Sequence, residues 1–195
     1  MEYRLNKDTL LVMIGNWVPF IKRKIQLVAC GGTALTLMGF KESTKDVDFM
    51  VPDKNEYKYL INTLKDLGYK QVSGSGWKKE GEVFIIDLFE GNKIHTTELM
   101  ESPLNEGNHI FFKELNNIKI SIINDNDLIA SKIFRGTGVD IDDCMSLIRN
   151  RKGIIDIEKV LDHVKELARH DISYDKIIGH IKDFIENLKE AGLYE

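Results

Sequence analysis

The chain has 195 residues, of which 43% are hydrophobic and 30% are charged, and its formal net charge is −4. This composition is typical of a globular protein with one buried core and a small appended unit, and the negative charge argues against a protein that holds nucleic acid on a broad basic surface. No run of about 18 apolar residues predicts a membrane span, and the N-terminus lacks the pattern of a signal peptide, so we expect a cytoplasmic protein with no membrane partner.

The first third of the chain changes its hydrophobic period twice. Apolar residues at helical spacing predict a helix over residues 8–24, with Asp8 as its N-terminal cap. A short apolar run predicts a buried strand over residues 25–30, and a short helix is expected over residues 33–38.

The rest of the chain continues as strands and then as helices. Further strands are predicted over residues 47–51, 69–72, 83–89 and 118–123, with a turn at 73–76. Further helices are predicted over residues 55–67, 126–135, 140–149, 156–169 and 174–191. This order predicts an α+β fold: a small mixed β-sheet with helices packed on one side and a helical C-terminal portion.

The cysteines and histidines do not form a metal-binding pattern. Cys30 and Cys144 lie far apart in apolar surroundings, so we expect buried free thiols rather than a disulfide or a zinc site. The five histidines are scattered, and we expect them to have structural or surface roles: His95, His109, His163, His170 and His180.

The most informative stretch joins a double glycine to a pair of aspartates. Gly31 and Gly32 end a predicted strand before a helix, and such a turn allows a phosphate to approach the backbone and the helix N-terminus. Thirteen residues then separate Gly32 from Asp46, and Asp48 follows two positions later. On a strand, residues i and i+2 project from the same face, so both carboxylates point to one site.

A third carboxylate, Asp87, stands in the otherwise apolar strand over residues 83–89. Burying an acid there is costly unless it is paired or binds a metal. Oxygen-only ligands suit Mg²⁺ or Mn²⁺, and three acids can hold two ions that serve an attacking hydroxyl and a leaving pyrophosphate. The alternative is structural: the glycines form an ordinary turn, the Asp-x-Asp pair caps a strand, and Asp87 faces water.

The pattern of Gly31-Gly32, thirteen residues and then Asp46-Val47-Asp48 resembles the signature of the nucleotidyltransferase superfamily that includes DNA polymerase beta. Within it, Gly-Gly-Thr-Ala-Leu is similar to the toxin-like branch of AbiEii-type enzymes. The resemblance implies that Asp46 and Asp48 bind the catalytic ions and that Asp87 completes the triad and activates the acceptor hydroxyl. Many members have Gly-Ser in place of the double glycine, and Thr33 is a candidate to supply the missing hydroxyl to the nucleotide.

A second, weaker match lies in residues 127–143. It resembles that branch's helix with a lysine, followed by an acidic helix start. The resemblance implies that Lys132 contacts the triphosphate and that an aspartate of the next helix supports the site, with three candidates left open: Asp140, Asp142 and Asp143.

The resemblance implies a domain plan and a reaction. Residues 1–150 would form the nucleotidyltransferase domain, and residues 151–195 a helical extension packed on it. The expected reaction is Mg²⁺-dependent transfer of a nucleoside monophosphate from a nucleoside triphosphate to a hydroxyl of RNA, protein or a small molecule. The protein could be a toxin held in check by an antitoxin protein; the alternative is an inactive nucleotide- or partner-binding module with the same fold.

Overall fold

Strands β1 (Ile25–Ala29) and β2 (Val47–Val51) form the middle of a seven-stranded sheet in this computed structural model, which describes residues 3–194. The sheet order is β3-β4-β5-β2-β1-β9-β8. The pairs β1–β9 and β2–β5 are parallel and the other pairs are antiparallel, which confirms the predicted mixed sheet. The remaining strands are β3 (Tyr69–Gln71), β4 (Gly76–Lys79), β5 (Ile86–Glu90), β8 (His109–Leu115) and β9 (Ile118–Ile123).

The segment after the Gly-Ser-Gly turn differs from the prediction. The turn leads directly into β4, which pairs with β3, and the strand predicted over residues 83–89 begins only at Ile86. β4 contains one apolar side chain, Trp77, so it shows no alternating pattern in the sequence. The half-exposed edge strand β8 was missed because its apolar residues do not alternate with polar ones. The hairpin of β6 (Lys93–Ile94) and β7 (Thr97–Glu98) was missed because its strands have two residues each.

The helix predicted over residues 8–24 is too long. α1 spans Lys7–Gly15, and its N-cap is Asn6 rather than Asp8, because the Asn6 side chain accepts a hydrogen bond from the Thr9 backbone N–H at 2.9 Å. Pro19 lacks a backbone N–H and disfavours a helical conformation at the residue before it. The apolar residues beyond Gly15 therefore reach the core from turns, and Trp17 and Ile21 are each 1% exposed.

The predicted helices beside the sheet are present. α2 (Gly31–Met38) follows β1 directly, and α3 (Lys54–Asp66) follows β2 with Asp53 as its N-cap. α2 packs on β2 and β9, whereas α3 packs on β1, β2 and β3. The two predicted free thiols are also confirmed, since Cys30 and Cys144 are both buried and unpaired.

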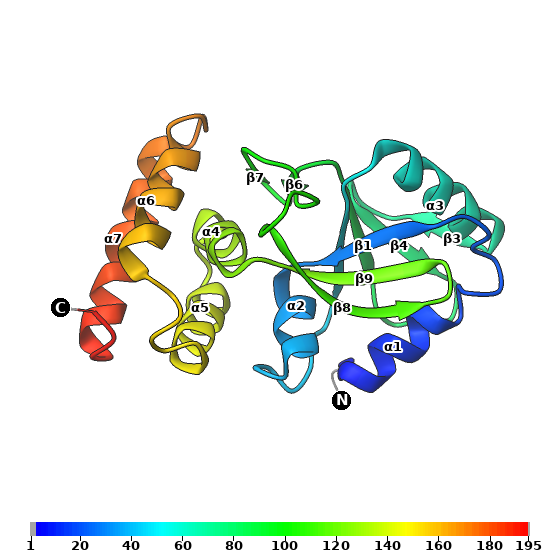
Figure 1. Cartoon of the computed structure of the whole chain (residues 1–195), viewed down its shortest axis with the longest axis horizontal. Coiled ribbons are helices and arrows are strands. Elements are labelled where there is room, and N and C mark those ends of the chain that lie inside the picture. The colour runs from blue at the N-terminus through cyan, green and yellow to red at the C-terminus, as the bar shows by residue number, and fades with distance from the viewer. Residues whose placement is uncertain (1–2, 195) are drawn as a thin grey trace.

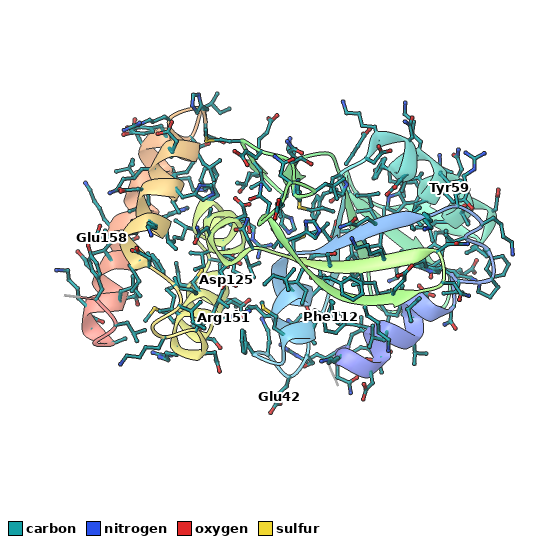
Figure 2. All side chains as sticks on the ribbon, viewed as in Figure 1. Glu42, Tyr59, Phe112, Asp125, Arg151 and Glu158 are labelled. Atoms are coloured by element: carbon teal, nitrogen blue, oxygen red, sulfur yellow. The ribbon has the colours of Figure 1, made fainter. Side chains whose placement is uncertain are left out.

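Four helices complete the chain: α4 (Asp125–Arg135), α5 (Gly138–Asn150), α6 (Ile157–Ala168) and α7 (Tyr174–Glu190). Figure 1 shows the sheet at one end of the molecule, the α6–α7 pair at the other, and α4 and α5 between them. α4 contacts α5, α6 and α7. Figure 2 labels Asp125 and Arg151, whose ion pair of 3.7 Å ties the start of α4 to the end of α5. α4 is thus held on several sides.

Within residues 3–194, none of the helices has the combination of length and apolar character that crossing a membrane requires.

Candidate active site

Three aspartates face a single cleft of about 240 Å³. Asp48 in β2 and Asp87 in β5 are direct partners on two parallel strands, so their side chains leave the sheet on the same face. Asp46 lies in the bend immediately before β2, two residues from Asp48, and also lines the cleft. The cleft wall also carries five cationic side chains: Arg4, Lys41, Lys45, Lys132 and Arg135.

The carboxylates repel one another at this spacing. Burial and then the neighbouring Asp87 raise the pKa of Asp48 to about 7, against the opposing effect of Arg135. Burial and Asp87 also raise the pKa of Asp46. A cation between these groups would relieve the repulsion and favour their charged forms.

The double glycine makes room for the carboxylates. Gly31 has a φ of +55°, and a Cβ there would lie 2.4 Å from the Asp48 carboxylate oxygen Oδ2. A Cβ on Gly32 would lie 2.6 Å from the Thr44 hydroxyl, and Gly32 itself lines the cleft. Gly31 thus gives space to Asp48, whereas Gly32 offers its backbone to the cleft.

Thr33 has a different place from the one predicted. Its side chain is fully buried, and its hydroxyl accepts a hydrogen bond from the Asp48 N–H at 2.9 Å and donates to the Asp46 carbonyl at 3.3 Å. The hydroxyl therefore joins α2 to the start of β2, and Thr33 does not line the cleft as a contact with the nucleotide would require.

Lys132 projects from α4 into a group of acids on α5. Its Nζ donates to Asp143 Oδ2 at 2.7 Å and lies 3.5 Å from Asp140 Oδ1. Asp143 also accepts from Lys41 at 2.8 Å. Of the three candidate supporting aspartates, the structure brings Asp140 and Asp143 to Lys132, while Asp142 is exposed.

Arg135 and His95 also line the cleft, and neither was among the predicted site residues. The Arg135 guanidinium donates to Asp140 through Nη2 and to His95 Nε2 through Nη1, the second at 3.1 Å. His95 Nε2 also lies 3.7 Å from Asp48 Oδ1. Burial and then Arg135 lower the pKa of His95 to about 4. For Asp140, burial acts to raise the pKa, but hydrogen bonds from Arg135 and Thr137 hold it below its usual value.

Most of the sequence matches the model of one protein family. Residues 16–189 match the family described as nucleotidyltransferase of unknown function (DUF6036). The chain is a member of this nucleotidyltransferase family. No protein with a curated description matches it in sequence.

Comparison with solved structures gives one likeness of the whole fold. The solution structure of the antibiotic-resistance factor ANT(2'')-Ia superposes with a TM-score of 0.60, over 90% of this chain and 100% of that one, at 12% sequence identity. An antigenic nucleotidyltransferase-like protein from Paracoccidioides brasiliensis aligns at 15% identity over 92% of this chain and 95% of that one, with a TM-score of 0.48. The ANT(2'')-Ia likeness confirms the α+β fold with a helical C-terminal portion.

The donor set of this nucleotidyltransferase fits a magnesium ion bound together with its substrate. Within residues 3–194, no three Asp, Glu, His or Cys side chains are arranged to enclose a metal by themselves, so the predicted aspartate triad does not form a closed cage. Mg²⁺ in nucleotide enzymes is commonly held by one or two carboxylates and completed by substrate phosphates and waters. The carboxylates of Asp46, Asp48 and Asp87 repel one another and can supply such metal ligands. The cationic side chains that line the same cleft suit the substrate phosphates.

Proposed function

We propose that this protein transfers a nucleoside monophosphate from a nucleoside triphosphate to a hydroxyl acceptor and releases pyrophosphate. The observation that carries this proposal is the shared cleft, which is lined by Asp48 and Asp87 on adjacent strands, by Asp46 just before β2, and by five cationic side chains. The carboxylates suit metal binding and proton removal, and the cations suit the phosphates.

Each residue then has a role that its position supports. Asp46 and Asp48 would hold Mg²⁺, which when bound neutralises charge on the reacting phosphates. The acceptor oxygen forms a bond to the α-phosphorus, the bond from that phosphorus to the bridging oxygen of the β-phosphate breaks, and Asp87 takes the hydroxyl proton. Gly32 and Lys132 would contact the phosphates, since both line the cleft.

The geometry around Asp87 supports its role as the base. The Ser75 hydroxyl donates to Asp87 Oδ1 at 2.6 Å, which fixes the orientation of the carboxylate and leaves Oδ2 for another partner. Asp87 is only partly buried, so an acceptor can reach it from the cleft.

The test is transfer of α-labelled ATP, GTP, CTP and UTP to total RNA and to a protein extract, with Mg²⁺. Asp48→Asn keeps the side-chain shape and is expected to abolish labelling. The matched control is Asp162→Asn, which changes an exposed side chain of α6 and is expected to leave labelling unchanged. Labelled acceptor identifies the acceptor class. Equal labelling by the Asp48→Asn enzyme would refute the assignment, and binding of nucleotide without transfer to any acceptor would support the alternative of an inactive module.

We further propose that the protein is a cytoplasmic toxin controlled by an antitoxin protein, with a hydroxyl of RNA, protein or a small molecule as its acceptor. The support is the similarity of residues 31–35 to the AbiEii-type motif. Expression of the wild-type protein, but not of Asp48→Asn, should then arrest growth, and co-expression of a gene encoded beside it should restore growth. Growth unaffected by the wild-type protein would contradict the toxin role.

A further inference from the structure

Arg135 has the position and the chemistry of a phosphate-binding residue. Its guanidinium lines the cleft, and the side chain is 32% exposed. One terminal nitrogen is bonded to Asp140 and the other to His95. A guanidinium has five N–H donors in a fixed plane, so two anchored nitrogens orient the plane and leave further donors for a ligand.

The partners of Arg135 do not neutralise the cluster to which it belongs. Lys41, Lys132 and Arg135 are three cations that share two anions, Asp140 and Asp143. The remaining positive charge lies at the cleft wall, opposite the aspartates of the sheet. A polyphosphate placed there would meet a cation that is already oriented.

His95 contributes an acceptor rather than a charge. Arginine has no hydrogen-bond acceptor, so the His95 Nε2 that faces it at 3.1 Å must carry a lone pair, and the ring proton is then on Nδ1. The neutral imidazole fixes Arg135 without offsetting its charge. This differs from Asp140, which anchors the guanidinium and also balances its charge.

The backbone at His95 is held in an uncommon conformation to reach this position. Its φ is +51°, in the left-handed region that a residue with a side chain rarely adopts. Ile94 and Thr97, on the two strands of the hairpin, are fully buried, and the imidazole packs edge-on against Phe89 with ring centroids 4.6 Å apart. These contacts fix the ring, and strained positions of this kind cluster at functional sites.

The cleft is also too small and too polar for a whole nucleotide. Its 240 Å³ is below the range of about 300–1,000 Å³ that is usual for ligand pockets, and Val139 is its single apolar lining residue among those described. Two larger cavities, of about 450 and 670 Å³, adjoin it, and His95 lines all three. The cleft thus suits the phosphates alone. His95 lies between it and the larger cavities that have room for the rest of the nucleotide.

We propose that Arg135 binds the phosphates of the nucleoside triphosphate and that His95 is the positioning residue that holds its guanidinium toward them. This inference rests on the proposed function for the identity of the ligand. It goes beyond that function by adding two residues to the phosphate-binding side of the cleft: His95 from the β6–β7 hairpin and Arg135 from the end of α4.

The test compares two substitutions at one position. His95→Phe keeps a ring against Phe89 but removes the acceptor, whereas His95→Gln removes the ring but keeps an acceptor. We expect His95→Phe to raise the KM for nucleoside triphosphate about tenfold, with kcat and the KM for the acceptor within about threefold of wild type. The KM for nucleoside triphosphate should be much closer to the wild-type value in His95→Gln than in His95→Phe. Arg135→Lys, which keeps the charge but cannot bond to both partners, should resemble His95→Phe.

A binding measurement separates this inference from the proposed reaction. Calorimetry with inorganic tripolyphosphate and Mg²⁺ requires neither an acceptor nor turnover, and the Kd should rise about tenfold in His95→Phe and in Arg135→Lys. Thermal unfolding of each variant checks the fold. Transfer with an unchanged Kd and KM in both variants would overturn the role of the pair and leave the reaction standing. Weakened tripolyphosphate binding without any transfer would support the pair and refute the reaction.

Discussion

Asp48 and Asp87 are direct neighbours across two parallel strands, and their carboxylates line the same cleft. Asp48 is 6% exposed, so water does little to reduce the electrostatic repulsion between the two carboxylates. The protein therefore keeps an unfavourable charge arrangement at its centre. Such an arrangement is expected where a metal ion and a polyphosphate are to be bound, and it has consequences for stability.

The first prediction concerns stability without metal. The pKa of Asp48 is raised from 3.8 to about 7 in the folded chain. Between about pH 4 and pH 7 the folded chain binds a proton that the unfolded chain has released, so the free energy of unfolding falls as the pH rises through this window. At about 1.4 kcal/mol per pKa unit, the loss is up to about 4 kcal/mol. In EDTA, Asp48→Asn should therefore be more stable than wild type at pH 8 by about 1–4 kcal/mol, and less so at pH 5.

Urea unfolding at both pH values measures this difference, and Asp162→Asn serves as the surface control. Addition of Mg²⁺ with tripolyphosphate should stabilise the wild type more than Asp48→Asn. Equal stability of wild type and Asp48→Asn at pH 8 would contradict the buried-charge argument.

The second prediction concerns Gly31. Gly31→Ala places a methyl group against the Asp48 carboxylate and also strains a positive φ. Gly39→Ala strains a positive φ of +81° at the C-cap of the same helix, but its Cβ would meet no neighbouring group within 4 Å. Both variants should lose about 1 kcal/mol or more of stability. Nucleotidyl transfer should fall strongly in Gly31→Ala alone, and a parallel loss in Gly39→Ala would show that backbone strain is sufficient.

The third prediction concerns the hydroxyl that joins α2 to β2. Thr33→Val removes the acceptor of the buried Asp48 N–H and leaves that donor unpaired, at a cost of about 1–3 kcal/mol. Thr33→Ser keeps the hydroxyl and should lose less. Chemical denaturation measures both, and a KM for nucleotide that rises in Thr33→Ser would indicate contact with substrate instead.

The fourth prediction concerns Ser75. Ser75→Ala removes the hydrogen bond to Asp87 Oδ1, so the carboxylate is less well oriented toward the acceptor. We expect kcat to fall by about tenfold with the KM for nucleotide unchanged, whereas Asp87→Asn should lower kcat by about 10²–10⁴-fold. Steady-state kinetics distinguish the two. A Ser75→Ala enzyme with raised KM for nucleotide and normal kcat would place Ser75 on the phosphate side.

The fifth prediction concerns residues 151–195, which we propose to be an extension that supports the nucleotidyltransferase domain through α4. α6 and α7 both pack on α4, and they bury nine apolar side chains: Val160, Leu161, Val164, Leu167, Ala168, Ile177, Ile181, Phe184 and Leu188. A chain ended at residue 150 exposes the face of α4 that packs on α6 and α7. α4 is also the helix that carries Lys132 and Arg135. It should aggregate or unfold at a much lower temperature, as judged by size-exclusion chromatography and circular dichroism. A shortened chain with the wild-type Tm would contradict this role.

The sequence was informative about the sheet-borne part of the site because that part is local. Asp46 and Asp48 lie two residues apart where a recognisable strand begins, and Asp87 stands out as an acid in an apolar run. That Asp87 is the partner of Asp48 follows from strand order, which no local pattern specifies. The helices from α2 onward were also predictable, since each has a clear apolar period and a stop signal.

The cationic part of the site was less predictable because it depends on long-range contacts. His95 is a lone histidine in a hairpin too short to show a pattern, and its partner Arg135 is forty positions away. Lys41 meets Asp143 across 102 positions. A half-buried histidine or a shared carboxylate leaves no local pattern in the sequence, so only the folded chain shows that these residues meet.

The two sides of the cleft come from different kinds of structure. Asp48 and Asp87 lie on strands hydrogen-bonded to each other inside one sheet, whereas Lys132 and Arg135 lie on α4, whose position depends on packing with α5, α6 and α7. Substitutions in those outer helices would therefore move the cationic side of the cleft while the carboxylates of the sheet stay in place. The affinity for phosphates can thus change through helix packing alone, at positions far from any group that would touch the substrate.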